Sequence, residues 1–367
     1  MSQSRESDRS LEQSLNPLDG AGSDASELLT DLESQRRVAA AADLPVEARL
    51  EAFEDIFESQ VGDTTLSRAR NIEREAGVRQ LFLKFEGGNP TGTQKDRIAF
   101  AQAMDALRRG FDALTVATCG NYGAAVAFAA YLAGLRCYIY VPETYRTDRM
   151  EEMRSLGAEV IRVAADYERA VRISQDRARE QEIYDANPGG GNTSLQIRAY
   201  GEIAYEIYDE LRDAPAVVAV PVSNGTTLAG VYHGFVSLYR RGKTSRIPRL
   251  FAGSSYRKNP IIQAFLDGSP RCVDLQVGAI QETRVNEPLI NWHAADGDQA
   301  LEAVRRSGGL ASYVSDRGML EYARRLRDTE GLNALPASTA GLIVLRNQHR
   351  SRPLPSDRYV AILTGRK

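Results

Sequence analysis

Cysteine, histidine and long apolar runs are scarce in this sequence, and their scarcity excludes several classes of protein. The three cysteines are widely spaced and odd in number, which fits neither a disulfide framework nor a cysteine metal site and predicts a reducing, cytoplasmic location. The three histidines are also scattered, so neither a zinc site nor a Ser-His-Asp triad is indicated, and we predict no bound metal. No apolar stretch is long enough to cross a bilayer, and no secretory signal is recognisable.

An excess of positive charge is missing as well. The formal net charge is −3 over 367 residues, which provides neither a basic stripe for nucleic acid nor a polybasic segment for a membrane. The length and an ordinary hydrophobic content of 43% predict a globular protein with two domains or one large one. The expected partner is therefore a small molecule.

The first part of the chain differs from the rest in composition. Residues 1–25 are poor in large apolar side chains, so they bury too little surface to offset their ordering entropy, and we predict a disordered tail. From Ser26 to about Gln60 the apolar residues follow helical spacing, as at Phe53 and Ile56. We interpret these helices as a packing layer or an oligomer contact.

Beyond about Val61, short β-rich runs alternate with helical stretches. Helical spacing covers 98–107, 124–132, 149–156 and 167–181. The alternation predicts βαβ units, and therefore an α/β fold whose parallel sheet is covered on both faces. Ligands of such sheets bind beyond the carboxyl ends of the strands. The predicted strands are 81–85, 113–117, 137–141, 160–163, 217–220, 250–253 and 359–363.

The segment after the first of these strands places one lysine at a fixed point. Residues 89–92 (Asn-Pro-Thr-Gly) carry turn chemistry and helical spacing starts at Ile98, so Lys95 stands between a turn and a helix. A lysine held over a sheet edge suits an amine that loses its proton and attacks a carbonyl carbon. Without neighbours of matching chemistry, such a lysine is more often a solvated surface charge.

Three further strand ends carry small hydrogen-bonding residues. Residues 223–227 offer consecutive backbone N–H groups at a helix N-terminus, which is how a fold binds phosphate without a dedicated cation. Asn121 offers an amide donor and Thr364 a hydroxyl, although each alone is better explained as a cap or turn residue. Together with Lys95 they match a phosphorylated aromatic aldehyde, and we predict pyridoxal 5′-phosphate (PLP) bound to Lys95 as a Schiff base.

With these residues in view, the sequence resembles the threonine-synthase-like family of fold type II (tryptophan synthase β-like) PLP enzymes. The similarity runs from about Gly62 to Lys367 and consists of several motifs in the family's order. In the first half of the chain, GDTTL (62–66) resembles G-N-T-P-L, LFLKFEGGNPTGTQKDR (81–97) resembles the strand and turn that end in N-P-T-G-S-F-K-D-R, and TCGNY (118–122) resembles S-T-G-N-T. In the second half, VPVSNGTTLAG (220–230) resembles the phosphate loop, LPASTAG (335–341) resembles E-P-x-S-A-A, and ILTG (362–365) resembles V-x-L-T-G.

The resemblance implies two three-layer αβα domains with mostly parallel sheets and the cofactor in the cleft between them. N-terminal helices and the first part of the large domain would span 26–95, a small mobile domain 96–205, and the rest of the large PLP-binding domain 206–367. Lys95 would hold the cofactor and act as the catalytic base, in a homodimer. The implied cofactor-binding residues are Lys95, Asn121, Ser223, Asn224, Gly225, Thr226, Thr227 and Thr364, and the implied substrate-binding residues are Thr118, Cys119, Gly120 and Tyr122.

Departures from the family pattern concern the substrate. Tyr122 replaces the small hydroxyl residue that helps threonine synthases hold the substrate phosphate. The family segment N-P-x-R-x-x-G-Q-K-T is poorly kept around 192–204, which leaves open whether Gln196 or Arg198 takes the place of its arginine. We therefore expect a reshaped substrate pocket.

The function that the resemblance implies is β- or γ-elimination or replacement at an O-activated, first of all O-phospho, amino acid. A replacement would use a second, nucleophilic substrate and form a new amino acid. Three alternatives stay open: an O-phosphoserine-dependent β-replacing synthase of the cysteate synthase kind, a serine/threonine ammonia-lyase, and a non-catalytic PLP-fold binding protein. The presence of Lys95, Asn121 and the 223–227 loop argues against the last.

Overall fold

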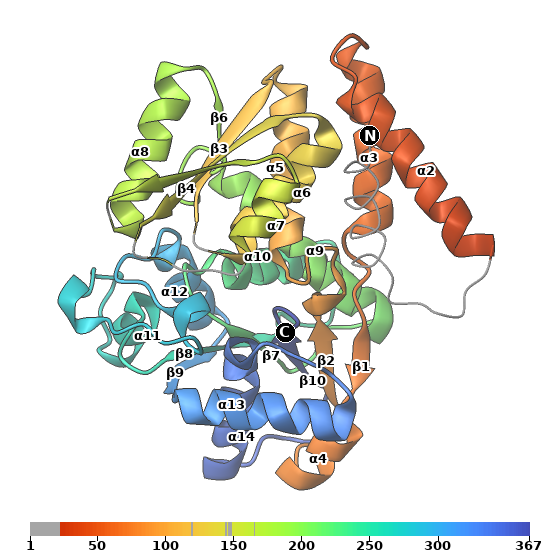
Figure 1. The fold of residues 1–367 in the computed structure, drawn as a ribbon. Helices are drawn as coiled ribbons and strands as arrows, with labels where there is room; N and C mark the ends of the chain where they lie inside the picture. The colour runs from red at the N-terminus through yellow and green to blue at the C-terminus, as the bar shows by residue number, and fades with distance from the viewer. Residues whose placement is uncertain (1–22, 119, 144, 146–148, 165) are drawn as a thin grey trace.

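Two separate β-sheets organise the computed structural model, which describes residues 23–118, 120–143, 145, 149–164 and 166–367 (Figure 1). The larger sheet has the order β1 (Leu66–Arg68), β2 (Leu81–Phe85), β10 (Tyr359–Leu363), β7 (Val217–Pro221), β8 (Arg249–Ser255), β9 (Leu310–Val314). The smaller has the order β5 (Glu159–Val163), β4 (Arg136–Pro142), β3 (Ala113–Ala117), β6 (Tyr184–Asp185). All neighbours pair in parallel except β1 with β2, which confirms the predicted α/β class.

Helices cover both faces of each sheet. The smaller sheet packs against α5 (Lys95–Arg108), α6 (Asn121–Ala133) and α7 (Met150–Ser155) on one side and α8 (Tyr167–Glu180) on the other (Figure 1). The larger sheet packs against α10 (Thr226–Arg240), α11 (Pro260–Leu266), α12 (Gly297–Arg306) and α14 (Ala340–Ser351), with α4 (Arg70–Ala76) beside β2. Helix α9 (Thr193–Leu211) packs against α10, and α13 (Asp316–Arg325) packs against α14. Every residue of β3, β7 and β10 is buried, which is why these strands read as continuous apolar runs.

Helices α9 and α10 approach each other closely because glycines stand at their crossing. A Cβ added to Gly234 would lie 2.5 Å from the carbonyl oxygen of Gly201, and one added to Gly230 would lie 2.7 Å from that of Ile197. Neither glycine tolerates a side chain without moving a helix. The start of α10, which carries the predicted phosphate loop, is thereby fixed relative to α9.

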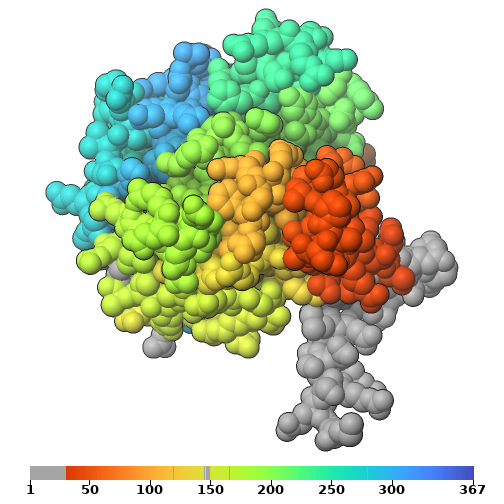
Figure 2. All heavy atoms as spheres, turned by 90° about the horizontal axis from the view of Figure 1, so that it is seen from above, coloured from red at the N-terminus to blue at the C-terminus, as the bar shows by residue number. Residues whose placement is uncertain are grey.

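The two N-terminal helices, α2 (Ser23–Ala40) and α3 (Val46–Gln60), form a layer on the flank of the molecule (Figure 2). Phe53 stacks on Phe100 of α5 with ring centroids 5.7 Å apart, and the Arg49 guanidinium donates to the Ala133 carbonyl at 3.2 Å. These contacts confirm the packing-layer interpretation, whereas a role in oligomer contact stays a prediction. Helix α2 begins at Ser23, and residues 1–22 lie outside the described part, so the predicted tail of 1–25 stays a prediction.

The seven predicted strands all occur, within two residues at each end. Strands β1, β6 and β9 were not predicted; β1 and β6 have only three and two residues, and β9 carries no continuous apolar run. The strands of the smaller sheet fall between residues 113 and 185, inside the predicted small domain, whose boundaries and mobility remain predictions. Among the described residues, no helix is long and apolar enough to cross a membrane.

Candidate active site

Lys95 is the first residue of α5, and the turn before it is held by its own side chains. The Asp96 carboxylate accepts hydrogen bonds from the Thr91 N–H at 2.9 Å and the Thr91 hydroxyl at 2.7 Å. The Gln94 N–H donates to the Thr364 carbonyl at 3.0 Å, so the lysine turn is tied to the end of β10. Lys95 and Thr364 are neighbours because β2 and β10 pair in parallel and end at the same sheet edge.

A buried ionic cluster lies behind this turn and consists of Lys84, Glu86, Arg97 and Glu206. Arg97 bonds Glu86 through Nε at 2.6 Å and Glu206 through Nη1 at 2.6 Å, and Lys84 pairs with the same Glu206. Burial alone would raise the pKa of Glu206, but hydrogen bonds and charge from Arg97 and Lys84 lower it to about 2. The cluster anchors the helix that begins at Lys95.

The Lys95 amine lies in a desolvated position. Its Nζ is 5.7 Å from the ring centroid of Tyr122 and 6.0 Å from that of Tyr200. Burial lowers the pKa of Lys95 to about 8, although the charge of Asp296 acts in the opposite direction. A substantial fraction of this amine is therefore neutral near physiological pH, as a nucleophile or base requires.

The loop after β7 forms a cup of backbone donors. The N–H groups of residues 223–227 donate to no oxygen of the described residues, and they face the same small cavity as Lys95. Gly225 has φ +96°, and a Cβ there would lie 2.6 Å from Ala300 Cβ. The Asn259 side chain donates to the Ser223 carbonyl at 3.0 Å and supports the loop from behind. Such a cup suits a phosphate group.

An amide and a hydroxyl complete the small cavity. Arg149 Nη1 donates to Asn121 Oδ1 at 2.7 Å, which fixes the orientation of the amide and leaves its Nδ2 as a donor. Thr364 lines the same cavity, as does Ser338. All eight residues predicted to contact the cofactor line this one cavity: Lys95, Asn121, Ser223, Asn224, Gly225, Thr226, Thr227 and Thr364.

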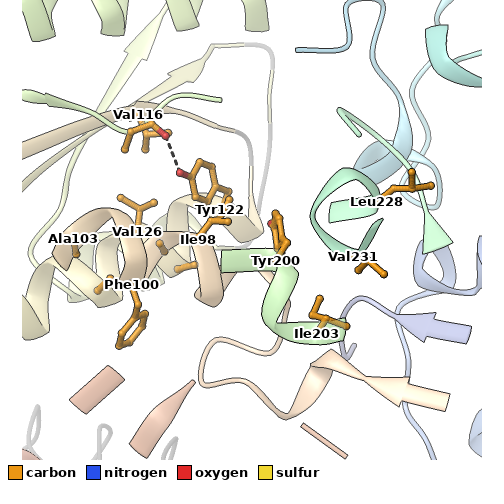
Figure 3. Close-up of a cluster of buried hydrophobic side chains, with 14 of the residues drawn as sticks. Ile98, Phe100, Ala103, Val116, Tyr122, Val126, Tyr200, Ile203, Leu228 and Val231 are labelled. Carbon is orange, nitrogen blue, oxygen red and sulfur yellow. Dashed lines mark hydrogen bonds between the residues drawn. The ribbon is translucent and has the colours of Figure 1, made fainter. Parts of the chain in front are cut away.

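A second, larger cavity opens from the first, and Lys95 lines both. Thr118, Gly120 and Tyr122 line it as predicted for substrate-binding residues; Cys119 lies outside the described residues. The Tyr122 hydroxyl does not reach the cavity, because it donates to the Ala186 carbonyl at 2.7 Å and accepts from Gln102 (Figure 3). Tyr122 therefore presents only its ring, beside Ile98.

The two candidates for the family's arginine position differ in their surroundings. Gln196 is buried and lines the larger cavity, whereas Arg198 is exposed and lies outside its lining. A neutral amide therefore faces the cavity. Gln196 and Arg198 fall on different faces of α9. Only the packing of α9 against α5 and α10 shows which of the two side chains faces inward.

Several residues in or beside the cavities were missed by sequence reasoning. Asp296 precedes α12, yet its side chain does not cap that helix and instead accepts hydrogen bonds from Thr226 and from Thr193, the latter at 3.4 Å. Asp296 lines neither cavity but contacts the lining residue Thr226, whereas Glu168, Glu287 and Trp292 line the larger cavity. All except Glu168 come from the long connection between α11 and α12, which carries no motif that points to the site.

The fold and this pair of cavities are those of a fold type II PLP enzyme, since one cavity brings together an amine, a loop of backbone donors, an amide and a hydroxyl. The comparisons agree: residues 57–365 match the family described as "Pyridoxal-phosphate dependent enzyme", and the chain belongs to that family.

Similar proteins carry names from one part of this family. Threonine synthase from Bacillus sp. (strain ULM1) is 30% identical over 306 residues, which cover 83% of this chain and 82% of that protein. Threonine synthase from Methanocaldococcus jannaschii is 29% identical over 312 residues, which cover 83% of this chain and 74% of that protein. These relatives confirm the resemblance to the threonine-synthase-like family.

Solved structures share the fold at lower identity. Maize serine racemase superposes with a TM-score of 0.72 at 19% identity, covering 86% of this chain and 92% of that one. The processed form of threonine deaminase isoform 2 from Solanum lycopersicum superposes with a TM-score of 0.70 at 17% identity, covering 96% of this chain and 92% of that one. The two-sheet architecture is therefore common to proteins with several different names.

Proposed function

We propose that this chain catalyses elimination or replacement at the β- or γ-carbon of an amino acid that carries an oxygen-linked leaving group. The proposal depends chiefly on one observation: Lys95, with a pKa lowered to about 8, lines both the smaller cavity and the larger one. The names of the threonine synthase relatives support the same class of reaction.

Each residue of the small cavity has a role in this proposal. Residues 223–227 would hold the PLP phosphate through their N–H groups, Asn121 Nδ2 would serve the 3′-oxygen of the ring, and the Thr364 hydroxyl would serve the ring nitrogen; all of these residues line the smaller cavity. When bound, PLP supplies an electron sink for negative charge at the α-carbon of the amino acid. Lys95 removes the α-proton, since its desolvated amine is largely available as a base near pH 8.

The residues of the larger cavity accommodate the side chain of the substrate. The Tyr122 and Tyr200 rings lie within about 6 Å of Lys95 Nζ and shield its amine from water. Trp292 forms another part of the wall. Exclusion of water favours replacement by a bound nucleophile over hydrolysis.

A spectral titration tests the proposal. The purified protein is loaded with PLP, and its visible absorbance is followed while serine, threonine, O-acetylserine, O-phosphoserine and O-phosphohomoserine are added singly. We expect a visible band that is absent in Lys95→Ala, is retained in the control Lys243→Ala, whose side chain is exposed, and changes with one of these amino acids.

The products distinguish the alternatives. A new amino acid indicates replacement, whereas ammonia with a 2-oxo acid and no second substrate indicates the ammonia-lyase. A wild-type protein that shows no lysine-dependent band after PLP addition would refute the proposal and leave a binding protein on this fold.

A further inference from the structure

The larger cavity is unusual in its charge. It has a volume of about 310 Å³, and Lys95 is the sole cation among its described lining residues. Its lining also includes four carboxylates: Asp166, Glu168, Glu282 and Glu287. Since the proposed function commits the Lys95 amine to the cofactor and the α-proton, no described cation remains for the side chain of the substrate.

Glu287 is the carboxylate with the clearest need of a partner. It is partly buried, and none of the described residues donates a hydrogen bond to its side chain or pairs with it. Burial, together with the like charge of Glu282, raises the pKa of Glu287 to about 7. Asp166 differs, because its carboxylate caps α8 by accepting from the Arg169 N–H at 2.8 Å.

Gln196 adds an independent observation on another element. Its Nε2 is directed at two acceptors, Gln102 Oε1 and the Asn187 carbonyl, each 3.4 Å away, which fixes the orientation of the amide. Its Oε1 is buried and has no hydrogen-bond partner among the described residues, although Gln196 lines the cavity. A buried acceptor without a donor is costly, and a ligand that donates a hydrogen bond would satisfy it.

The described cations that stand close in the sequence to cavity residues do not line the cavity: Arg97 belongs to the buried ionic cluster, and Arg169 and Arg284 are exposed. Arg149 pairs with Glu152 at 2.8 Å and bonds Asn121, and Arg198 is exposed. A phosphate dianion in the larger cavity would therefore face carboxylates and the oxygen of an amide. A group that donates hydrogen bonds and carries positive charge fits the same lining.

We propose that the larger cavity binds a protonated primary amino group, with Glu287 and Gln196 Oε1 as its acceptors. This inference rests on the proposed function and names the chemistry of its second reactant group. The ammonium has two possible sources: an amine that acts as the nucleophile, or the side chain of the diamino acid that such a replacement forms. In the first case Lys95 removes the α-proton and the leaving group departs with the electron pair of the C–O bond; the ammonium then releases a proton, its nitrogen bonds to the β-carbon, and the α-carbon takes a proton back.

Calorimetric binding to the PLP-loaded protein tests the inference with a matched pair of ligands. L-2,4-diaminobutyrate carries an ammonium where L-homoserine carries a hydroxyl, and O-phosphohomoserine carries a phosphate. We expect diaminobutyrate to bind about tenfold more tightly than homoserine, because a charge-assisted hydrogen bond contributes about that factor. In Glu287→Gln the preference should largely disappear.

The control is Glu202→Gln, a carboxylate of α9 outside the cavity lining, which should keep the preference. If Glu287→Gln fails to fold, Glu168→Gln on α8 replaces it and should also weaken the preference.

A second experiment adds ethylammonium together with O-acetylserine and analyses the products by mass spectrometry. An N-ethyl-2,3-diaminopropionate product identifies the amine as nucleophile, whereas a response to diaminobutyrate alone identifies a diamino acid.

Three results would overturn the inference: equal binding of diaminobutyrate and homoserine, tighter binding of O-phosphohomoserine, or a preference that survives in Glu287→Gln. Failure of the proposed function has a different signature. In that case no amino acid, charged or neutral, changes the visible band of the loaded protein.

Discussion

Glu206 should contribute strongly to stability, and Glu206→Gln measures how much. The side chain of Glu206 is 14% exposed and binds Arg97 and Lys84, whose side chains are 3% and 1% exposed. Its pKa is lowered from 4.5 to about 2, and a difference of about 2.5 units corresponds to about 3 kcal/mol of stability above pH 4.5. Removal of one partner from a buried pair costs a similar amount, about 3–5 kcal/mol. Two lines of reasoning thus give the same magnitude.

The assay is urea denaturation of the PLP-free protein at pH 7, followed by far-ultraviolet circular dichroism. We expect Glu206→Gln to lower the free energy of unfolding by about 3 kcal/mol. The control Glu210→Gln lies one turn further along α9 at an exposed position and should change it by less than about 0.5 kcal/mol.

The pH dependence provides a second check on the same residue. Because the folded pKa of Glu206 lies below its unfolded value, its contribution is fully present above pH 4.5 and is lost as the pH falls toward about 2. Wild type should therefore lose more stability than Glu206→Gln over that interval. If Glu206→Gln lowers the free energy of unfolding at pH 7 by less than about 1 kcal/mol, the ionic cluster is not an anchor of α5.

Three other predictions concern the site. Gly225→Ala should weaken PLP binding at least about tenfold in a fluorescence titration, since φ +96° and the contact with Ala300 both disfavour a side chain; unchanged affinity would mean that the loop is not the phosphate site. The rate of PLP capture by the PLP-free protein should rise about tenfold per pH unit below pH 8 and level above it, because the neutral Lys95 amine reacts and its pKa is about 8. A flat profile in stopped-flow absorbance would contradict this. Tyr122→Phe should lower the free energy of unfolding by about 1–3 kcal/mol, since the Ala186 carbonyl loses its donor, but leave PLP affinity unchanged; a loss of PLP affinity without a loss of stability would place the hydroxyl in the site instead.

Much of the small cavity could be predicted from the sequence because parallel strands end at one sheet edge. Lys95, the 223–227 loop and Thr364 each follow a strand, and β2, β10 and β7 are consecutive neighbours in the larger sheet. Asn121 follows a strand of the smaller sheet, so only the fold brings it to the same cavity. Local chemistry identified the residues, and the parallel arrangement explains why they meet.

The larger cavity could not be predicted in the same way. Glu287 and Trp292 belong to the connection between α11 and α12, which contains only short 3₁₀ turns, so neither periodicity nor turn chemistry fixes their directions. The choice between Gln196 and Arg198 depends on the rotation of α9 about its axis, which tertiary packing sets. The charge of this cavity is thus a property of tertiary structure.

The separation of the two cavities has a consequence for protein engineering. Glu168, Gln196 and Glu287 line the larger cavity without lining the smaller one, and they come from three different elements. Substitutions at these three positions can therefore be combined in libraries that select for new reactants while cofactor retention is preserved. The glycines at the crossing of α9 and α10 should be kept constant in such libraries, because they fix Gln196 relative to the phosphate loop.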